Sequence, residues 1–106
     1  MKDLIAKGFD FSIRIIELSN YLSEEQKQFP LVGRMLECGT GIGACLLISY
    51  KFTKNLQESY AQAYRLSLET EYLLELLVKT GFINKIQSIP ILTDCRFIKD
   101  EIGKQL

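Results

Sequence analysis

Residues 37–51 read ECGTGIGACLLISYK, and they contain no charged side chain between Glu37 and Lys51. This stretch is apolar or small on every side of a helix, but it is shorter than the roughly 20 apolar residues that a membrane span needs. Three glycines in a helix cost about 1 kcal/mol each relative to alanine, so close packing has to compensate. The stretch therefore predicts a helix buried on nearly every face, either central in the domain or covered by another subunit.

Helical periodicity extends from this stretch over the whole chain. Apolar or small residues recur in alternating steps of three and four, as the buried stripe of a helix requires. The predicted stripes are Leu4, Gly8, Phe11, Ile15, Leu18 and Leu22; Val32, Met35, Gly39, Ile42, Leu46 and Ser49; Leu56, Ser59, Ala63, Leu66, Thr70, Leu73 and Leu77; and Ile91, Cys95, Ile98 and Ile102. A second line widens the buried face of the first helix, as expected where a helix touches two neighbours. This line comprises Ile5, Phe9, Ile13 and Ile16.

The ends of the middle helices follow from proline, glycine and capping residues. The second helix is expected over about residues 30–50, because proline suits a first helical turn. The third is expected to begin near Thr53 as N-cap and to run to Lys79, before Gly81 takes the left-handed conformation that ends a helix. Small residues in its first half predict a close approach to the glycines of an antiparallel second helix.

The fourth helix is expected after Asn84, a second capping residue, with a break or kink at Pro90. No stretch shows the alternation and turn residues of a β-hairpin. Four helices joined by short loops predict an all-α, antiparallel up-down-up-down four-helix bundle. At this length, residues 1–106 are expected to form a single domain.

The amino-acid composition argues against several classes of function. Thirteen basic and thirteen acidic side chains cancel, so no global field steers the chain to nucleic acid or to an anionic membrane. Charges interrupt the N-terminal apolar residues, which fits neither a signal peptide nor a transit peptide. The three cysteines form no regular disulfide framework. A cytoplasmic protein with reduced thiols, and with no membrane association, is expected.

Catalytic and metal-binding interpretations are weak. The chain has no histidine, the commonest general base and zinc ligand. Glycines 39–43 match neither the dinucleotide-binding nor the P-loop spacing, so helix packing is preferred over phosphate binding. Cys38 and Cys45 share a helix face, but buried structural thiols are the simpler interpretation. We expect no enzymatic activity, no cofactor and no metal.

A group of carboxylates in the third helix is a further candidate for metal binding. Glu69, Glu71 and Glu75 could bind a metal, but di-iron bundles pair glutamate with histidine. A solvated helix face is the preferred interpretation. The second helix is expected to supply helix-packing contacts or an oligomer interface through Cys38, Gly39, Gly41, Ile42, Gly43, Cys45 and Ile48.

Three segments carry a resemblance to a known family. These segments are GTGIGA at 39–44, ETEYLL at 69–74 and KTG at 79–81. Together they resemble the four-helix bundle proteins encoded in intervening sequences of bacterial 23S rRNA genes, from about Phe9 to Ile83. The resemblance implies a homo-oligomer, often a pentameric ring. A related branch serves diversity-generating retroelements by binding reverse transcriptase and nucleic acid.

The chain departs from the family pattern in its second helix. Cys38, Gly41 and Cys45 stand where the family has polar residues, and Glu37 replaces an arginine. Ile48 stands where a glutamate is common. We therefore expect a self-associating assembly module, with a protein partner possible. A nucleic-acid- or reverse-transcriptase-binding accessory protein is the weaker alternative.

Overall fold

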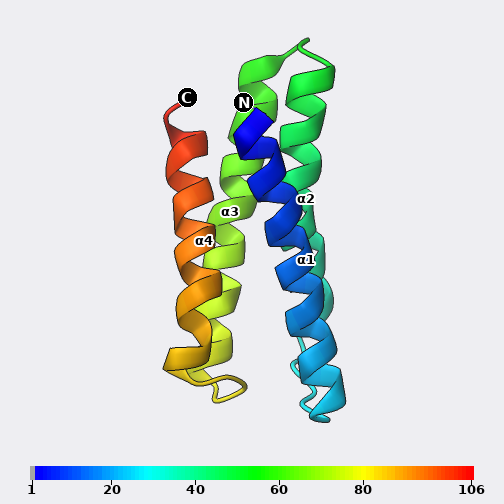
Figure 1. Cartoon of the computed structure of the whole chain (residues 1–106), viewed down its shortest axis with the longest axis vertical. Helices are drawn as coiled ribbons and strands as arrows, with labels where there is room; N and C mark the ends of the chain where they lie inside the picture. The colour runs from blue at the N-terminus through cyan, green and yellow to red at the C-terminus, as the bar shows by residue number, and fades with distance from the viewer. Residues whose placement is uncertain (1) are drawn as a thin grey trace.

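The computed structural model describes residues 2–106 as four α-helices: α1 (Lys2–Glu24), α2 (Val32–Lys51), α3 (Leu56–Lys79) and α4 (Lys85–Gly103). No β-strand occurs within this described range. Successive helices run in opposite directions, and both ends of the chain lie at the same end of the bundle (Figure 1). The bundle is elongated, measuring 43 × 20 × 19 Å. The prediction of an all-α, antiparallel up-down-up-down bundle is confirmed.

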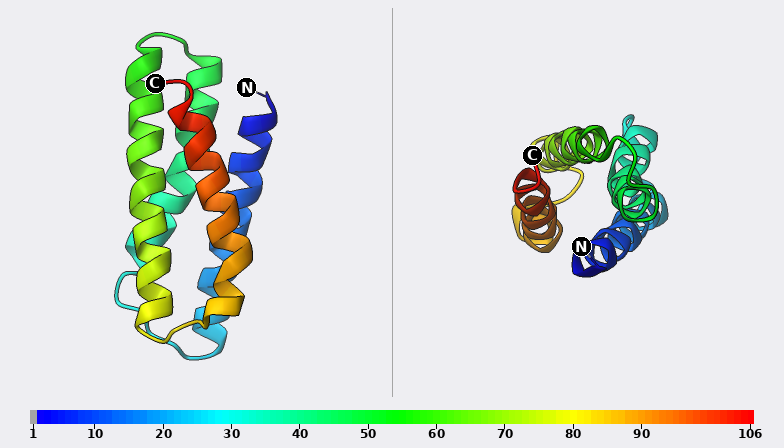
Figure 2. Two further views of the ribbon diagram at one scale, coloured as in Figure 1. Left: turned by 90° about the vertical axis from the view of Figure 1, so that its left-hand side faces the viewer. Right: turned by 90° about the horizontal axis from the view of Figure 1, so that it is seen from above.

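Seen along its long axis, the bundle places the helices in chain order around a square (Figure 2). Each helix packs along its neighbour in sequence, and α1 and α4 complete the square with the least extensive contact. The side between α1 and α4 is consequently the most open side of the bundle.

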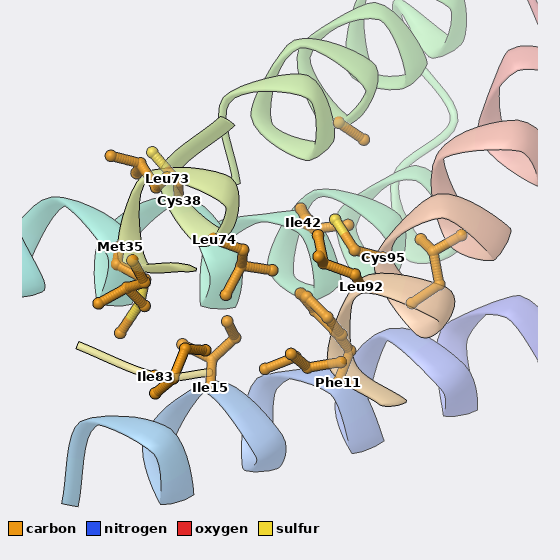
Figure 3. Packing of buried hydrophobic residues seen from close by; sticks show 14 of the residues in the cluster. Phe11, Ile15, Met35, Cys38, Ile42, Leu73, Leu74, Ile83, Leu92 and Cys95 are labelled. Atoms are coloured by element: carbon orange, nitrogen blue, oxygen red, sulfur yellow. The ribbon is translucent and has the colours of Figure 1, made fainter. Parts of the chain in front are cut away.

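The core lies where the predicted stripes converge. Phe11, Ile15, Ile42, Leu74 and Cys95 meet there from all four helices (Figure 3). All of these side chains are at most 1% exposed. Full burial of one large aliphatic side chain contributes roughly 2 kcal/mol, so this cluster dominates the stability of the bundle.

The capping predictions at the α3–α4 turn are confirmed. The Asn84 side chain accepts a hydrogen bond from the backbone N–H of Gln87 at 2.7 Å, and Gln87 accepts one from the backbone N–H of Asn84 at 2.8 Å. This reciprocal pair is a capping box, which satisfies two amides that the first helical turn leaves free. Gly81 follows α3 with φ of +84°, the left-handed conformation that glycine adopts without strain.

Two predicted helix boundaries are wrong. Thr53 does not cap α3, which begins at Leu56 after Asn55 takes a left-handed φ of 61°. Pro90 does not interrupt α4, which is continuous from Lys85 to Gly103. The carbonyl that loses its helical donor to Pro90 belongs to Ile86, a residue exposed enough for water to replace that hydrogen bond.

The α1–α2 loop and the α3–α4 loop contact each other. Lys27 in the α1–α2 loop donates through Nζ to the carbonyl oxygen of Phe82 in the α3–α4 loop at 2.8 Å. The Phe29 ring packs edge-on against that of Phe82, with centroids 5.2 Å apart. These contacts hold the two helix pairs in register.

The expectation that α2 is buried on nearly every face is wrong for the single chain. Ala44, Leu47 and Ile48 are exposed, because α2 occupies a corner of the square and not its centre. By length and composition alone α2 could also cross a membrane. Core helices of water-soluble proteins pass the same test, so this property does not distinguish a membrane-spanning helix from a core helix.

Candidate functional site

The seven residues proposed from the sequence as a packing or oligomer surface occupy different environments. Cys38, Gly39 and Ile42 are buried inside the bundle, and Gly41, Gly43 and Cys45 are half-buried. Only Ile48, half of whose side chain is exposed, offers a large surface to another molecule. Most of this set therefore packs helices together within one chain.

The contacts of the glycines explain their place in α2. A Cβ added to Gly43 would lie 2.9 Å from the carbonyl oxygen of Gly8, so the backbones of α1 and α2 touch there. A Cβ on Gly39 would lie 2.7 Å from Cγ1 of Ile15. Neither position has room for a side chain. The expected compensation by close helix packing is confirmed.

The partner of these glycines differs from the expected one. Gly39 and Gly43 face α1, and only Gly41 faces α3, where an added Cβ would meet a Leu66 methyl group at 3.0 Å. Residues four apart lie on one side of a helix, whereas Gly41 is displaced from both by about 160–200° around the axis. The glycine run thus serves two interfaces, mainly that with α1.

The second apolar line of α1 is exposed. Phe9, Ile13 and Ile16 are 68%, 44% and 46% exposed, which contradicts the prediction that this line is buried within the fold. Only Ile5, at one end of the line, is half-buried. The structure provides no covering helix on this side, because α1 has only two neighbours in the square.

Exposed apolar residues of α2 adjoin this line. The Gly8–Gly43 contact brings α1 and α2 together, and Leu47, one turn beyond Gly43, is 45% exposed. We call the surface formed by Phe9, Ile13, Ile16 and Leu47 the α1/α2 face. All four residues are uncharged, and three of them follow one another along α1.

Carboxylates of α3 hold the neighbouring helices in place. Glu69 pairs with Arg34 of α2. Glu71 accepts from Arg96 Nε at 2.7 Å and from Lys99 Nζ at 3.1 Å, both on α4. The two glutamates thus point to opposite neighbours of α3. Within residues 2–106, no cluster of three metal-ligating side chains occurs.

Comparison with solved structures identifies the family. A crystal structure of a protein of unknown function from the S23 ribosomal protein family of Bacteroides thetaiotaomicron superimposes with a TM-score of 0.88. The two sequences are 31% identical, and the match covers 93% of this chain and 94% of that one. The chain belongs to the S23 ribosomal protein family. No family model and no curated protein sequence matches it.

The segments that suggested the family are packing elements in this S23 protein. Gly39 and Gly43 let α2 approach α1, and Glu69 and Glu71 fasten α3 to α2 and α4. Thr70 between them is fully buried, and its hydroxyl donates to the carbonyl oxygen of Leu66 at 2.7 Å. These motifs of the S23 protein therefore make contacts that hold the helices of the bundle together.

The pKa values of all three cysteine thiols in the S23 protein are raised. Burial, together with the nearby Glu69 carboxylate, raises the pKa of Cys38 to about 11. Burial is also the main reason that the pKa of Cys95 rises to about 12. Burial raises the pKa of Cys45 as well, but this thiol is only half-buried. All three remain protonated at neutral pH, and protonated thiols are poor nucleophiles.

Thiol labelling of the native protein should therefore occur in two separate phases. With Ellman's reagent at pH 8, Cys45 should react first, and Cys38 and Cys95 should react roughly a hundredfold more slowly, because they require unfolding to reach the reagent. In urea all three should react together. A Cys45→Ser variant should lose only the fast phase. A single fast phase of three thiols in the native protein would contradict the burial described.

Proposed function

We propose that this S23-family protein is a non-enzymatic assembly module that associates with copies of itself through the α1/α2 face. The observation that carries the proposal is the continuous exposure of apolar side chains on that face. Phe9 is the most exposed of them, although aromatic residues usually lie inside a fold or at an interface.

The residue types of the α1/α2 face are those of a surface that contacts another protein. Protein interfaces have a core depleted of charge and enriched in aromatic and aliphatic side chains. Phe9, Ile13, Ile16 and Leu47 share these properties, and Ser12 and Gly43 between them keep the surface shallow. Covering such a patch removes apolar area from water at about 25 cal/mol per Å².

A closed ring is the form of assembly that we propose, with five copies as the family resemblance implies. A head-to-tail contact between two different surfaces generates a ring when its rotation closes. Further apolar side chains are exposed on α4, where Ile86 and Ile89 are 77% and 55% exposed, so a second surface is available for such a contact. The assembly would act in the cytoplasm, where its thiols stay reduced.

The carboxylates and thiols that the sequence singled out are paired or protonated, which supports a role without catalysis. Glu69 and Glu71 are paired with cations, and the cysteine thiols are protonated. Nucleic-acid binding is the weaker alternative, because thirteen acidic side chains balance the thirteen basic ones and no net positive field attracts phosphate.

The proposal is tested by placing charge on the α1/α2 face. The double variant Phe9→Glu, Ile13→Glu should sediment as a 12.2 kDa monomer, while the wild-type protein sediments as an oligomer. Both side chains are exposed in the single chain, so circular dichroism should show an intact bundle.

A matched control separates loss of the surface from added charge. The double variant Ser23→Glu, Gln28→Glu adds the same charge at exposed polar positions and should keep the wild-type mass. The proposal fails if the Phe9, Ile13 variant keeps the wild-type mass, or if both variants dissociate to the same extent.

A further inference from the structure

A second exposed apolar surface lies on the outer side of α4. Ile86, Ile89 and Phe97 are 77%, 55% and 45% exposed. Pro90 and Thr93 lie between them along the helix and are exposed as well. None of these five side chains is charged, and from Ile86 to Phe97 they extend over about 17 Å of helix at 1.5 Å per residue. We call these five residues the α4 corner.

The α4 corner projects between two sides of the bundle, because α4 stands at one corner of the square (Figure 2). Ile89 lines a cavity of about 460 Å³ between α3 and α4. Pro90 and Phe97 line cavities of about 400 and 340 Å³ between α4 and α1. Lys7 of α1 lies over the Phe97 ring, 4.8 Å from its centroid, and still leaves this side chain 45% exposed.

The α1/α2 face points in another direction. Lys7, Arg14 and Leu18 of α1 line the cavities that α1 shares with α4. Phe9 lies two residues from Lys7, and Ile16 lies two residues from Arg14 and from Leu18, which is about 200° around the helix axis. The α1/α2 face therefore points away from α4. The two apolar surfaces of one chain consequently face neither the same direction nor directly opposite ones.

We propose that the α4 corner of one copy contacts the α1/α2 face of the next. This inference rests on the proposed assembly and names the second surface of its contact. Pairing of the α1/α2 face with itself would give a two-fold dimer and leave Ile86 and Ile89 in water. Contact between the two different surfaces covers both of them. Because the two surfaces are set at an angle, each copy is rotated relative to the last, and successive contacts close into a ring.

The dimensions of the two surfaces suit a stable contact. The apolar line of α1 from Ile5 to Ile16 and that of α4 from Ile86 to Phe97 have the same length, about 17 Å. The two helices can therefore pack along each other over the whole of both lines. One side of the bundle, 43 Å long and about 20 Å wide, presents roughly 860 Å², and a stable interface buries about 800 Å² on each partner. Contact along the full length of one side is sufficient.

The test places charge on the α4 corner and compares the result with the variant charged on the α1/α2 face. The double variant Ile86→Glu, Ile89→Glu should sediment as a 12.2 kDa monomer, as the variant of the α1/α2 face should. Both substituted side chains are exposed, so circular dichroism should show an intact bundle. The control charged at Ser23 and Gln28 adds the same charge elsewhere and should keep the wild-type mass.

An equimolar mixture of the two charged variants tests whether the two surfaces bind each other. Each variant keeps the surface that the other has lost, so one contact between them remains. The mixture should therefore form a heterodimer of twice 12.2 kDa and no larger species. Sedimentation velocity with one variant fluorescently labelled measures this, at a protein concentration well above that at which the wild type assembles.

Two results would overturn this inference and leave the assembly itself in place. In the first, the Ile86, Ile89 variant keeps the wild-type mass, which would show that α4 lies outside the contact. In the second, the mixture stays at 12.2 kDa under those conditions, which would show that the two surfaces do not bind each other. A wild-type protein that is itself monomeric would instead refute the proposed assembly, and this inference with it.

Discussion

Replacing Gly43 by valine should lower the free energy of unfolding by about 3 kcal/mol. An added Cβ would lie 2.9 Å from the carbonyl oxygen and 3.1 Å from the carbonyl carbon of Gly8. Both atoms belong to the backbone of α1, which cannot rotate away as a side chain can. Separating the helices would also loosen Ile15 against Gly39, one turn along the same contact.

Another glycine of α2 provides the control for this prediction. An added Cβ on Gly33 would meet nothing within 4 Å, so Gly33→Ala should raise the free energy of unfolding by about 0.5 kcal/mol through helix propensity. Urea unfolding followed by circular dichroism measures both. Equal stability of the Gly43→Val variant and the wild type would refute the close approach of α1 and α2.

Removal of the Glu71 side chain should be the second large loss, about 2 kcal/mol for Glu71→Ala. Glu71 holds both Arg96 and Lys99, and the side chain of Lys99 is only 19% exposed. Without Glu71, Lys99 keeps its charge near the core with no acceptor. The control Glu75→Ala removes one exposed contact of Arg96 and should cost less than about 0.5 kcal/mol.

The stabilisation that Glu71 provides should depend on pH in a direction that follows from its pKa. Burial alone would raise the pKa of Glu71, but hydrogen bonds from Arg96 and Lys99 outweigh it, and the pKa lies below its ordinary value of 4.5. A lowered pKa stabilises the fold at pH values above the unfolded-state pKa. This contribution is lost as the pH falls through the folded-state pKa.

The difference in stability between the wild type and Glu71→Ala should therefore be full at pH 7 and should shrink below about pH 4. Urea unfolding of both proteins across this range measures it. A difference that stays constant down to pH 3, or an equal loss in the Glu75→Ala control, would show that Glu71 does not stabilise the bundle as an anion.

Local patterns in the sequence predicted where the helices lie along the chain. The stripe of Phe11, Ile15 and Leu22 is buried as its periodicity required. Asn84 caps the start of α4 and Gly81 follows the end of α3, as their conformational preferences indicated. Such features depend on one helix or one turn at a time. A single sequence contains all the information they need.

Features that depend on which helices are neighbours were harder to predict. A spacing of four residues puts Gly39 and Gly43 on one side of α2, but the spacing does not tell whether α1 or α3 lies there. The line of Phe9, Ile13 and Ile16 has the spacing of a buried face, yet no helix of the chain covers it. Apolar residues at helical spacing indicate a face that is buried. The spacing does not tell whether another helix of the chain or another molecule covers that face.

The proposed assembly requires that other copies of the chain cover the α1/α2 face. Light scattering coupled to size exclusion, at micromolar protein concentration, tests it without any substitution. A mass several times 12.2 kDa, five times for the proposed ring, is the predicted result. A single species of 12.2 kDa across that concentration range would show that the protein does not self-associate.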